Sequence, residues 1–117
     1  MWRKYTEERD DLEMDLNIIR ELCRSEKLQW TDHIFKRLLQ RDISMSDVQT
    51  AILNGEIIEE YPDDYPYPSC LIIGCRSINH FIHVVCAPDQ ENDILWLITA
   101  YVPDKEKWSV DFKTRRG

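Results

Sequence analysis

Three apolar runs in the second half of the chain decide the fold: Cys70-Leu-Ile-Ile-Gly-Cys75, His80-Phe-Ile-His-Val-Val-Cys-Ala87 and Ile94-Leu-Trp-Leu-Ile-Thr-Ala-Tyr-Val102. Runs of this length, rich in β-branched and aromatic residues and bounded by polar turn residues, are typical of β-strands. The segments between them, Ser77-Ile-Asn79 and Pro88–Asp93, are short, so we expect both connections to be hairpins. The last run is almost wholly apolar, which predicts a strand covered on both faces.

A fourth strand is expected earlier in the chain, where Ile57 and Ile58 lie in a short stretch that ends at Tyr61. The residues that follow, Pro62-Asp-Asp-Tyr-Pro-Tyr-Pro68, contain three prolines. Proline fixes the φ angle and lacks a backbone donor, so this segment predicts a stiff loop. Four consecutive strands joined in this way predict an antiparallel meander.

Helical periodicity fills the first half of the chain. Leu12, Leu16, Ile19 and Cys23 recur at the spacing of one helix face, and Thr6 is the expected N-cap. A chain that places helices before an antiparallel meander belongs to the α+β class. We therefore expect two to three N-terminal helices packed on one face of a four-stranded antiparallel sheet.

The second helix is predicted to begin at Thr31 or Asp32, both good N-caps, and to end at Arg41. Its apolar residues recur at helical spacing and are expected to define the buried side. They are Ile34, Phe35, Leu38 and Leu39.

A short third helix is predicted after Ser44-Met-Ser-Asp47, in which the serine and the acid three residues later suit a capping box. Asn54-Gly55 is expected to end this helix. The reason is that glycine accepts the left-handed conformation that closes many helices.

The composition fits one globular domain of 117 residues, with 43% hydrophobic and 32% charged residues. We expect three parts: a helical extension over 1–29, the helices and sheet over 30–102, and a basic tail over 103–117. No apolar run approaches the roughly 18 residues that span a bilayer, and no signal-peptide pattern opens the sequence. These features predict a cytoplasmic protein without membrane contact.

Charge and cysteines narrow the choice of function. The net charge of −7 argues against general coating of nucleic acid, although the stretch from Lys105 to Gly117 carries five lysines and arginines against only Glu106 and Asp111. The four cysteines include no C-x-x-C pair, and three of them fall in apolar runs, so reduced structural thiols are expected. Neither a metal site nor a cofactor is predicted.

Two sets of residues could carry chemistry. His33, Arg37 and Arg41 are spaced so that they form one stripe of the second helix. The alternative interpretation is an exposed, salt-bridged edge, which is normal on amphipathic helices. The second set lies in the strands: His83, with Thr99 and Tyr101 two residues apart on one face. The alternative here is a hydrogen-bonded core histidine beside two residues of high β-propensity.

Together the two sets would meet the demands of RNA cleavage without metal. Histidine transfers protons near neutral pH, and arginine offers a bidentate fork for phosphate oxygens. A separate candidate is the tyrosine- and proline-rich loop, whose aromatic and acidic side chains could bind a partner or stack on bases. These residues are Tyr61, Asp63, Asp64, Tyr65 and Tyr67. The alternative is a rigid loop that packs its own rings on the domain edge.

Several stretches resemble a bacterial family catalogued as domain of unknown function 4258. The likeness runs from Trp30 to Arg116, and its motifs agree in order and spacing. They are Asp32-His33 with Arg37 and Arg41, Asn54–Asp64, Tyr67–Leu71, His83-Val-Val, Ile98-Thr-Ala-Tyr101, Trp108 and Asp111–Arg116.

That family is similar in layout to the RelE-type toxins, metal-independent ribonucleases whose helices pack on a small antiparallel sheet. Its members are often encoded beside an antitoxin-like zinc-finger and helix-turn-helix protein. The resemblance implies an RNA substrate, an antitoxin partner and site residues at the six positions His33, Arg37, Arg41, His83, Thr99 and Tyr101.

Two hypotheses follow from the sequence. The first is a toxin-like, metal-independent ribonuclease of a toxin–antitoxin system. The alternative is a non-catalytic protein-binding or regulatory module, in which the acidic 42–64 region and the neighbouring tyrosine-proline loop meet a basic partner.

Overall fold

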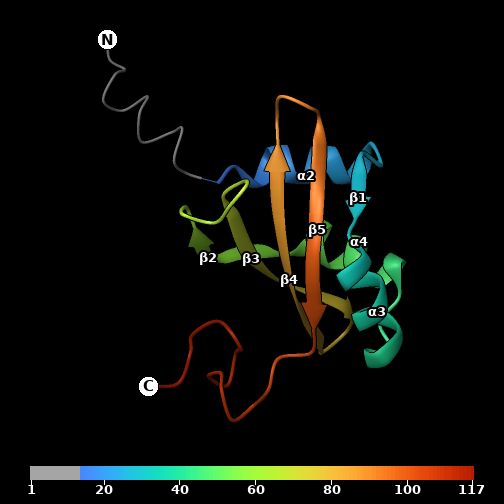
Figure 1. Ribbon diagram of the computed structural model, residues 1–117. Helices are drawn as coiled ribbons and strands as arrows, with labels where there is room; N and C mark the ends of the chain where they lie inside the picture. The colour runs from blue at the N-terminus through green and yellow to red at the C-terminus, as the bar shows by residue number, and fades with distance from the viewer. Residues whose placement is uncertain (1–13) are drawn as a thin grey trace.

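The structure is a computed structural model that describes residues 14–117, and its centre is a five-stranded sheet with the order β1-β5-β4-β3-β2 (Figure 1). The strands are β1 (Leu28–Trp30), β2 (Glu56–Tyr61), β3 (Ser69–Ser77), β4 (His80–Asp89) and β5 (Ile94–Tyr101). From β2 to β5 each strand pairs antiparallel with the next, so the predicted meander is confirmed. The prediction of four strands is wrong, because β1 adds a fifth that pairs parallel with β5.

The β1 strand has only three residues, too few for an alternating pattern to be visible in the sequence. Backbone hydrogen bonds fix it beside β5. The Leu95 amide donates to the Lys27 carbonyl at 2.8 Å, and the Thr31 amide donates to the Leu97 carbonyl at 3.4 Å. The strand is therefore defined by a partner far along the chain.

The helices are α2 (Leu16–Arg24), α3 (Asp32–Arg41) and α4 (Met45–Asn54). Polar side chains start all three. Asp15 caps α2, Thr31 caps α3, and Ser44 forms with Asp47 the predicted capping box of α4. The predicted cap at Thr6 and the periodic residue Leu12 lie outside the described residues.

Gly55 ends α4 for a different reason from the predicted one. Its φ of −93° and ψ of −174° are extended, so the left-handed prediction is wrong. A Cβ atom at this position would lie 2.4 Å from the carbonyl oxygen of Ile73 and 2.5 Å from that of Ala51. Glycine is required because the chain passes so close to a neighbouring strand. The left-handed residue that ends a helix is instead Asp42 after α3, at φ 56°.

The buried side of α3 is narrower than predicted. Ile34 and Leu38 are buried, but Phe35 is 43% exposed and Leu39 is 86% exposed, so the prediction is wrong for these two. The helix packs against β5, and this one strand covers only one stripe of its surface. Phe35 stacks on Trp30, with ring centroids 6.2 Å apart.

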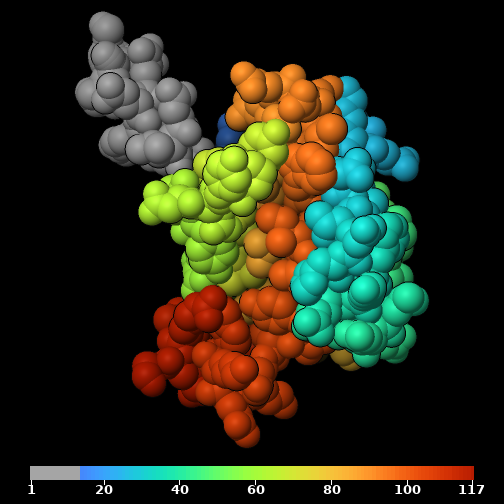
Figure 2. All heavy atoms as spheres, viewed as in Figure 1, coloured from blue at the N-terminus to red at the C-terminus, as the bar shows by residue number. Residues whose placement is uncertain are grey.

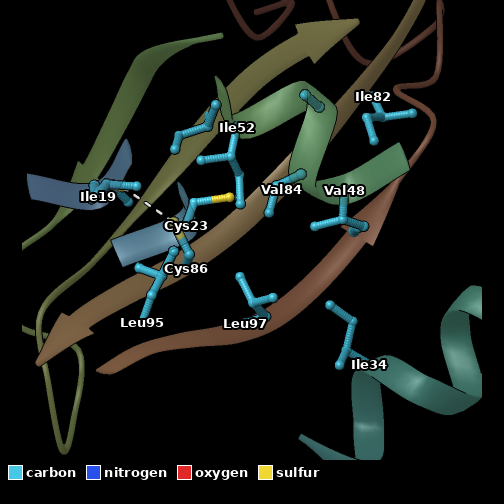
Figure 3. Packing of buried hydrophobic residues seen from close by; sticks show 14 of the residues in the cluster. Ile19, Cys23, Ile34, Val48, Ile52, Ile82, Val84, Cys86, Leu95 and Leu97 are labelled. Carbon is cyan, nitrogen blue, oxygen red and sulfur yellow. Dashed lines mark hydrogen bonds between the residues drawn. The ribbon is translucent and has the colours of Figure 1, made fainter. Parts of the chain in front are cut away.

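The hydrophobic core joins the helices to alternate residues of β3, β4 and β5 (Figure 3). Ile19 and Cys23 of α2 and Ile52 of α4 lie against Val84 and Cys86 of β4 in this cluster. The α4 helix packs mainly on β3 and α3 mainly on β5. No helix within residues 14–117 is long and apolar enough to cross a membrane.

The opposite face of the sheet is covered less completely. Along β5, Leu95, Leu97 and Ala100 are buried, whereas Trp96 and Ile98 are half-buried. The predicted cover on both faces of this strand is therefore wrong. The tail from residue 103 crosses one end of the more open face, and the loop over 62–68 borders the other end (Figure 2). The candidate site lies at the end of this face that the tail crosses.

Candidate functional site

The candidate site is built on a pair of residues that the sheet brings together. His83 of β4 and Tyr101 of β5 are direct partners in the antiparallel register, so their side chains lie on the same face. Their rings are 5.3 Å apart in an edge-on arrangement. The face they share is the one crossed by the tail, because His83 Nε2 bonds to the Phe112 carbonyl.

His83 is completely buried, and both of its ring nitrogens have partners. Nε2 lies 2.8 Å from the Phe112 carbonyl oxygen, which can only accept, so Nε2 carries the proton. In the neutral ring Nδ1 then accepts from the Tyr101 hydroxyl at 3.3 Å. Burial is the main cause that lowers the pKa of His83, and the imidazole is therefore neutral at pH 7.

Tyr101 connects this buried histidine to the surface. It is half-buried, and burial raises the pKa of its hydroxyl, which stays protonated at neutral pH. The guanidinium of Arg41 lies 5.9 Å from the centre of the Tyr101 ring. Arg41 reaches this position from the last turn of α3, where its Nη1 donates to the Ala100 carbonyl at 2.7 Å.

An open pocket of about 580 Å³ lies beside Tyr101. Its polar and aromatic lining consists of Arg41, Tyr101, Asp104, Lys107, Trp108 and Arg115. Three cations therefore face one carboxylate. Among residues 14–117, neither Arg41 nor Lys107 forms an ion pair, which leaves both charges available to an anion.

The third cation, Arg115, is already engaged. Its Nε and Nη2 donate to the two carboxylate oxygens of Glu59 at 2.9 and 3.1 Å. Its guanidinium also lies 4.6 Å from the Trp108 ring centre. Burial would raise the pKa of Glu59, but the hydrogen bonds from Arg115 and Tyr61 outweigh it and lower the pKa. Arg115 and Glu59 thus hold the tail on the sheet.

The structure brings together three of the six predicted site residues, Arg41, His83 and Tyr101. His33 and Arg37 are exposed on α3, and neither lines the pocket. Arg37 donates to the side chain of Gln40 at 3.3 Å. Thr99 is half-buried on the same face as His83 and Tyr101, but it also lies outside the pocket lining.

Lys107, Trp108 and Arg115 were not among the predicted site residues. The excess of basic residues in the tail was visible in the sequence, as was its tryptophan. What the sequence does not indicate is the path by which the tail returns over β4. Trp108 is buried there, edge-on to His83 at 4.5 Å.

The predicted partner-binding loop divides into residues with internal contacts and residues without them. The Tyr61 hydroxyl donates to Glu59 at 2.6 Å, and burial with this carboxylate raises the pKa of Tyr61 to about 12. Tyr67 stacks on Trp96, and Asp64 accepts a short hydrogen bond from Ser69. Asp63 and Tyr65 are exposed, Tyr65 to 94%.

No three histidine, cysteine, aspartate or glutamate side chains within residues 14–117 gather closely enough to hold a metal ion.

The fold and the site define a small α+β domain whose five-stranded sheet carries a buried histidine–tyrosine pair beside a basic, aromatic pocket. Residues 30–102, more than half of the chain, match the family described as a domain of unknown function, DUF4258, and the chain belongs to this family. No curated protein and no solved structure matches the chain. Arg41, His83 and Tyr101 lie within the matched residues, whereas Lys107, Trp108 and Arg115 follow them.

Proposed function

We propose that this domain is a metal-independent ribonuclease of the toxin type, which acts in the bacterial cytoplasm and is controlled by an antitoxin partner. The observation that carries the proposal is the hydrogen-bonded His83–Tyr101 pair at the wall of a pocket with two cations that form no ion pair within residues 14–117. The resemblance to RelE-type toxins, which cleave RNA without metal, supports the same activity.

The cations would bind the phosphate. Arg41 is fixed by its bond to the Ala100 carbonyl, and its remaining donors can hold non-bridging phosphate oxygens. Lys107, which is exposed at the pocket wall, adds a second positive charge. Charge builds on these oxygens as the bond to phosphorus forms, so the two cations would stabilise the transition state more than the ground state.

The histidine–tyrosine pair would handle the proton of the ribose 2′-hydroxyl. Tyr101 passes its own proton to His83 Nδ1 as it takes the proton of the 2′-hydroxyl. The 2′-oxygen then bonds to phosphorus and the bond to the 5′-oxygen breaks. The leaving oxygen takes a proton from the Lys107 ammonium, and the product is a 2′,3′-cyclic phosphate. His83 itself never touches the substrate, because its side chain is completely buried.

The acidic composition is compatible with this role because the basic residues are unevenly distributed. Two stretches, 43–75 and 77–104, contain ten of the 22 carboxylates and no lysine or arginine. The cations of the pocket come instead from the end of α3 and from the tail. A local basic site can therefore attract phosphate even though the net charge is −7.

The test uses purified protein, a 5′-labelled single-stranded RNA and a chelator in excess. We expect cleavage that ends in 2′,3′-cyclic phosphate. Loss of one charged hydrogen-bonding group should slow Arg41→Ala by about 10- to 100-fold. Tyr101→Phe removes the proton-transfer group, and its cleavage rate should be about 10²- to 10⁴-fold lower than that of the parent.

Arg37→Ala is the matched control. It removes the same charge from the same helix, one turn earlier, at an exposed position outside the pocket. This variant should cleave like the parent. If Arg41→Ala and Tyr101→Phe also cleaved at the parental rate, the proposed site would be wrong. If the parent protein bound RNA but did not cleave it, the proposed ribonuclease activity would be refuted.

A further inference from the structure

A second hollow, of about 300 Å³, lies near the other end of β5 from the basic pocket. The 62–68 loop borders it in Figure 2, on the same face of the molecule as the tail. The residues that line it include Asp64, Tyr65 and Tyr67 of the loop, Trp96 and Ile98 of β5, and Thr31 just before α3. We call it the aromatic groove. Its lining is mostly apolar, which distinguishes it from the basic pocket.

The floor of the aromatic groove is formed by two stacked rings. Tyr67 stacks on Trp96 with an interplanar angle of 16° and ring centroids 6.4 Å apart. The neighbouring carboxylate of Asp89 is the main cause that raises the pKa of the Tyr67 hydroxyl. Asp89 in turn accepts from the Asn92 side chain at 2.8 Å. The two stacked rings are thus positioned before any ligand arrives.

Tyr65 and Asp64 complete the groove at its rim. Tyr65 is 94% exposed, a large aromatic side chain with nothing packed around it. Asp64 is exposed and gives one carboxylate oxygen to the Ser69 hydroxyl, which leaves the other open to solvent or to a ligand. Three aromatic rings and a carboxylate are the combination that attracts a cation with an apolar stem.

The negative charge around the aromatic groove favours a positively charged ligand. The loop lies in the 43–75 stretch and Trp96 in the 77–104 stretch, neither of which contains a lysine or arginine. Asp64 adds an exposed negative charge at the rim, and the residue before it, Asp63, is exposed as well. Nucleic acid would be repelled here, whereas a basic polypeptide would be attracted and guided to the groove.

We propose that the aromatic groove is a docking site for a basic segment of a partner protein. A lysine or arginine side chain of that segment lies across the faces of Tyr65, Tyr67 and Trp96 and pairs with Asp64. This interaction is independent of RNA cleavage, since the groove shares no lining residue with the basic pocket.

The test is residue-resolved NMR on the ¹⁵N-labelled full chain. The probe is a heptapeptide of alternating glycine and arginine, and the reference is the same peptide with each arginine replaced by the neutral citrulline. We expect the arginine peptide to shift the Trp96 indole signal and the amides of Tyr65 and Tyr67. The citrulline peptide should leave these signals in place.

Two variants sharpen the test. Tyr65→Ala removes an exposed ring and should lower the affinity for the arginine peptide about threefold. Asp64→Asn should lower this affinity by a similar factor. Leu39→Ala is the control, because it truncates an equally exposed apolar side chain on α3 and should bind like the parent.

The proposal would be overturned if the peptide shifted acidic surface residues indiscriminately, without preference for the groove. Unchanged affinity in both Tyr65→Ala and Asp64→Asn would also overturn it, as would preferential shifts of the groove signals by an RNA oligonucleotide. The ribonuclease assay is separate, so the failure of one proposal is distinguishable from the failure of the other.

Discussion

Mild acid should destabilise this fold through one histidine. His83 is neutral in the folded protein because burial lowers its pKa. In the unfolded chain it takes up a proton near pH 6.5, the ordinary value. Below that pH the unfolded state binds more protons than the folded state, so the free energy of unfolding falls as the pH falls. This contribution is complete above pH 6.5 and is lost as the pH moves from 6.5 through the lower pKa of the folded state.

The size of the effect follows from linkage. One proton difference changes the free energy of unfolding by at most about 1.4 kcal/mol per pH unit. Between about pH 7.5 and 5.5 the loss is bounded by about 1.4 kcal/mol, because the unfolded imidazole is only fully protonated at the lower end. A domain of this size has a total stability of about 5–15 kcal/mol, so the change is measurable.

The assay is guanidinium unfolding followed by tryptophan fluorescence at a series of pH values. The parent should lose stability on acidification, and His83→Gln should be nearly flat over the same range. The control is a double variant, His33→Gln with His80→Gln, which replaces two exposed histidines and keeps His83. It should follow the parent.

Carboxylates do not interfere in this range. The pKa values of Asp47, Glu59 and Asp89 are lowered in the folded protein, so their contributions are lost only as the pH falls below about 4. An equal pH slope in the parent and His83→Gln would refute the reasoning. If His83→Gln did not fold, NMR titration of the parent imidazole would decide, and a folded pKa at or above 6.5 would refute it as well.

Two other substitutions test the packing that positions the site. Gly74→Ala should cost about 1–3 kcal/mol or more in denaturant unfolding, since its Cβ would lie 2.0 Å from the Ala51 carbonyl oxygen of α4. Gly117→Ala, with nothing within 4 Å, should be neutral, and a Gly74→Ala protein as stable as the parent would show that α4 does not press on β3. Ser44→Ala should lower the free energy of unfolding by about 1 kcal/mol, because it removes the capping box of α4. Ser46→Ala, within α4, should not lower it. Equal effects of the two substitutions would contradict the stabilising role of the Ser44 cap.

The sequence predicts those parts of the fold that depend on local patterns. The apolar runs and short connections were enough for the meander, and the serine and threonine caps marked the starts of α3 and α4. Features that depend on distant partners were missed or misread. β1 is defined by β5, and Gly55 is required by the approach of Ile73 rather than by its own φ.

The same division holds for the candidate site. Helical spacing placed Arg37 and Arg41 on one stripe, but it could not tell which turn of α3 reaches the sheet. Only Arg41 does, because it lies where the helix ends beside Ala100. The strand pattern singled out His83 and Tyr101 individually, and the register that pairs them became visible only in the sheet.

The tail contributes to two parts of the candidate site. Its attachments are the bond from His83 to the Phe112 carbonyl and the ion pairs of Arg115 with Glu59 and of Lys113 with Glu56. The tail covers His83, whose burial lowers its pKa, and it also places Lys107 at the pocket beside Tyr101. In the proposed mechanism the proton acceptor His83 and the second phosphate-binding cation Lys107 therefore both depend on the position of the tail. The sheet and Arg41 supply the remaining groups of the proposed site without the tail.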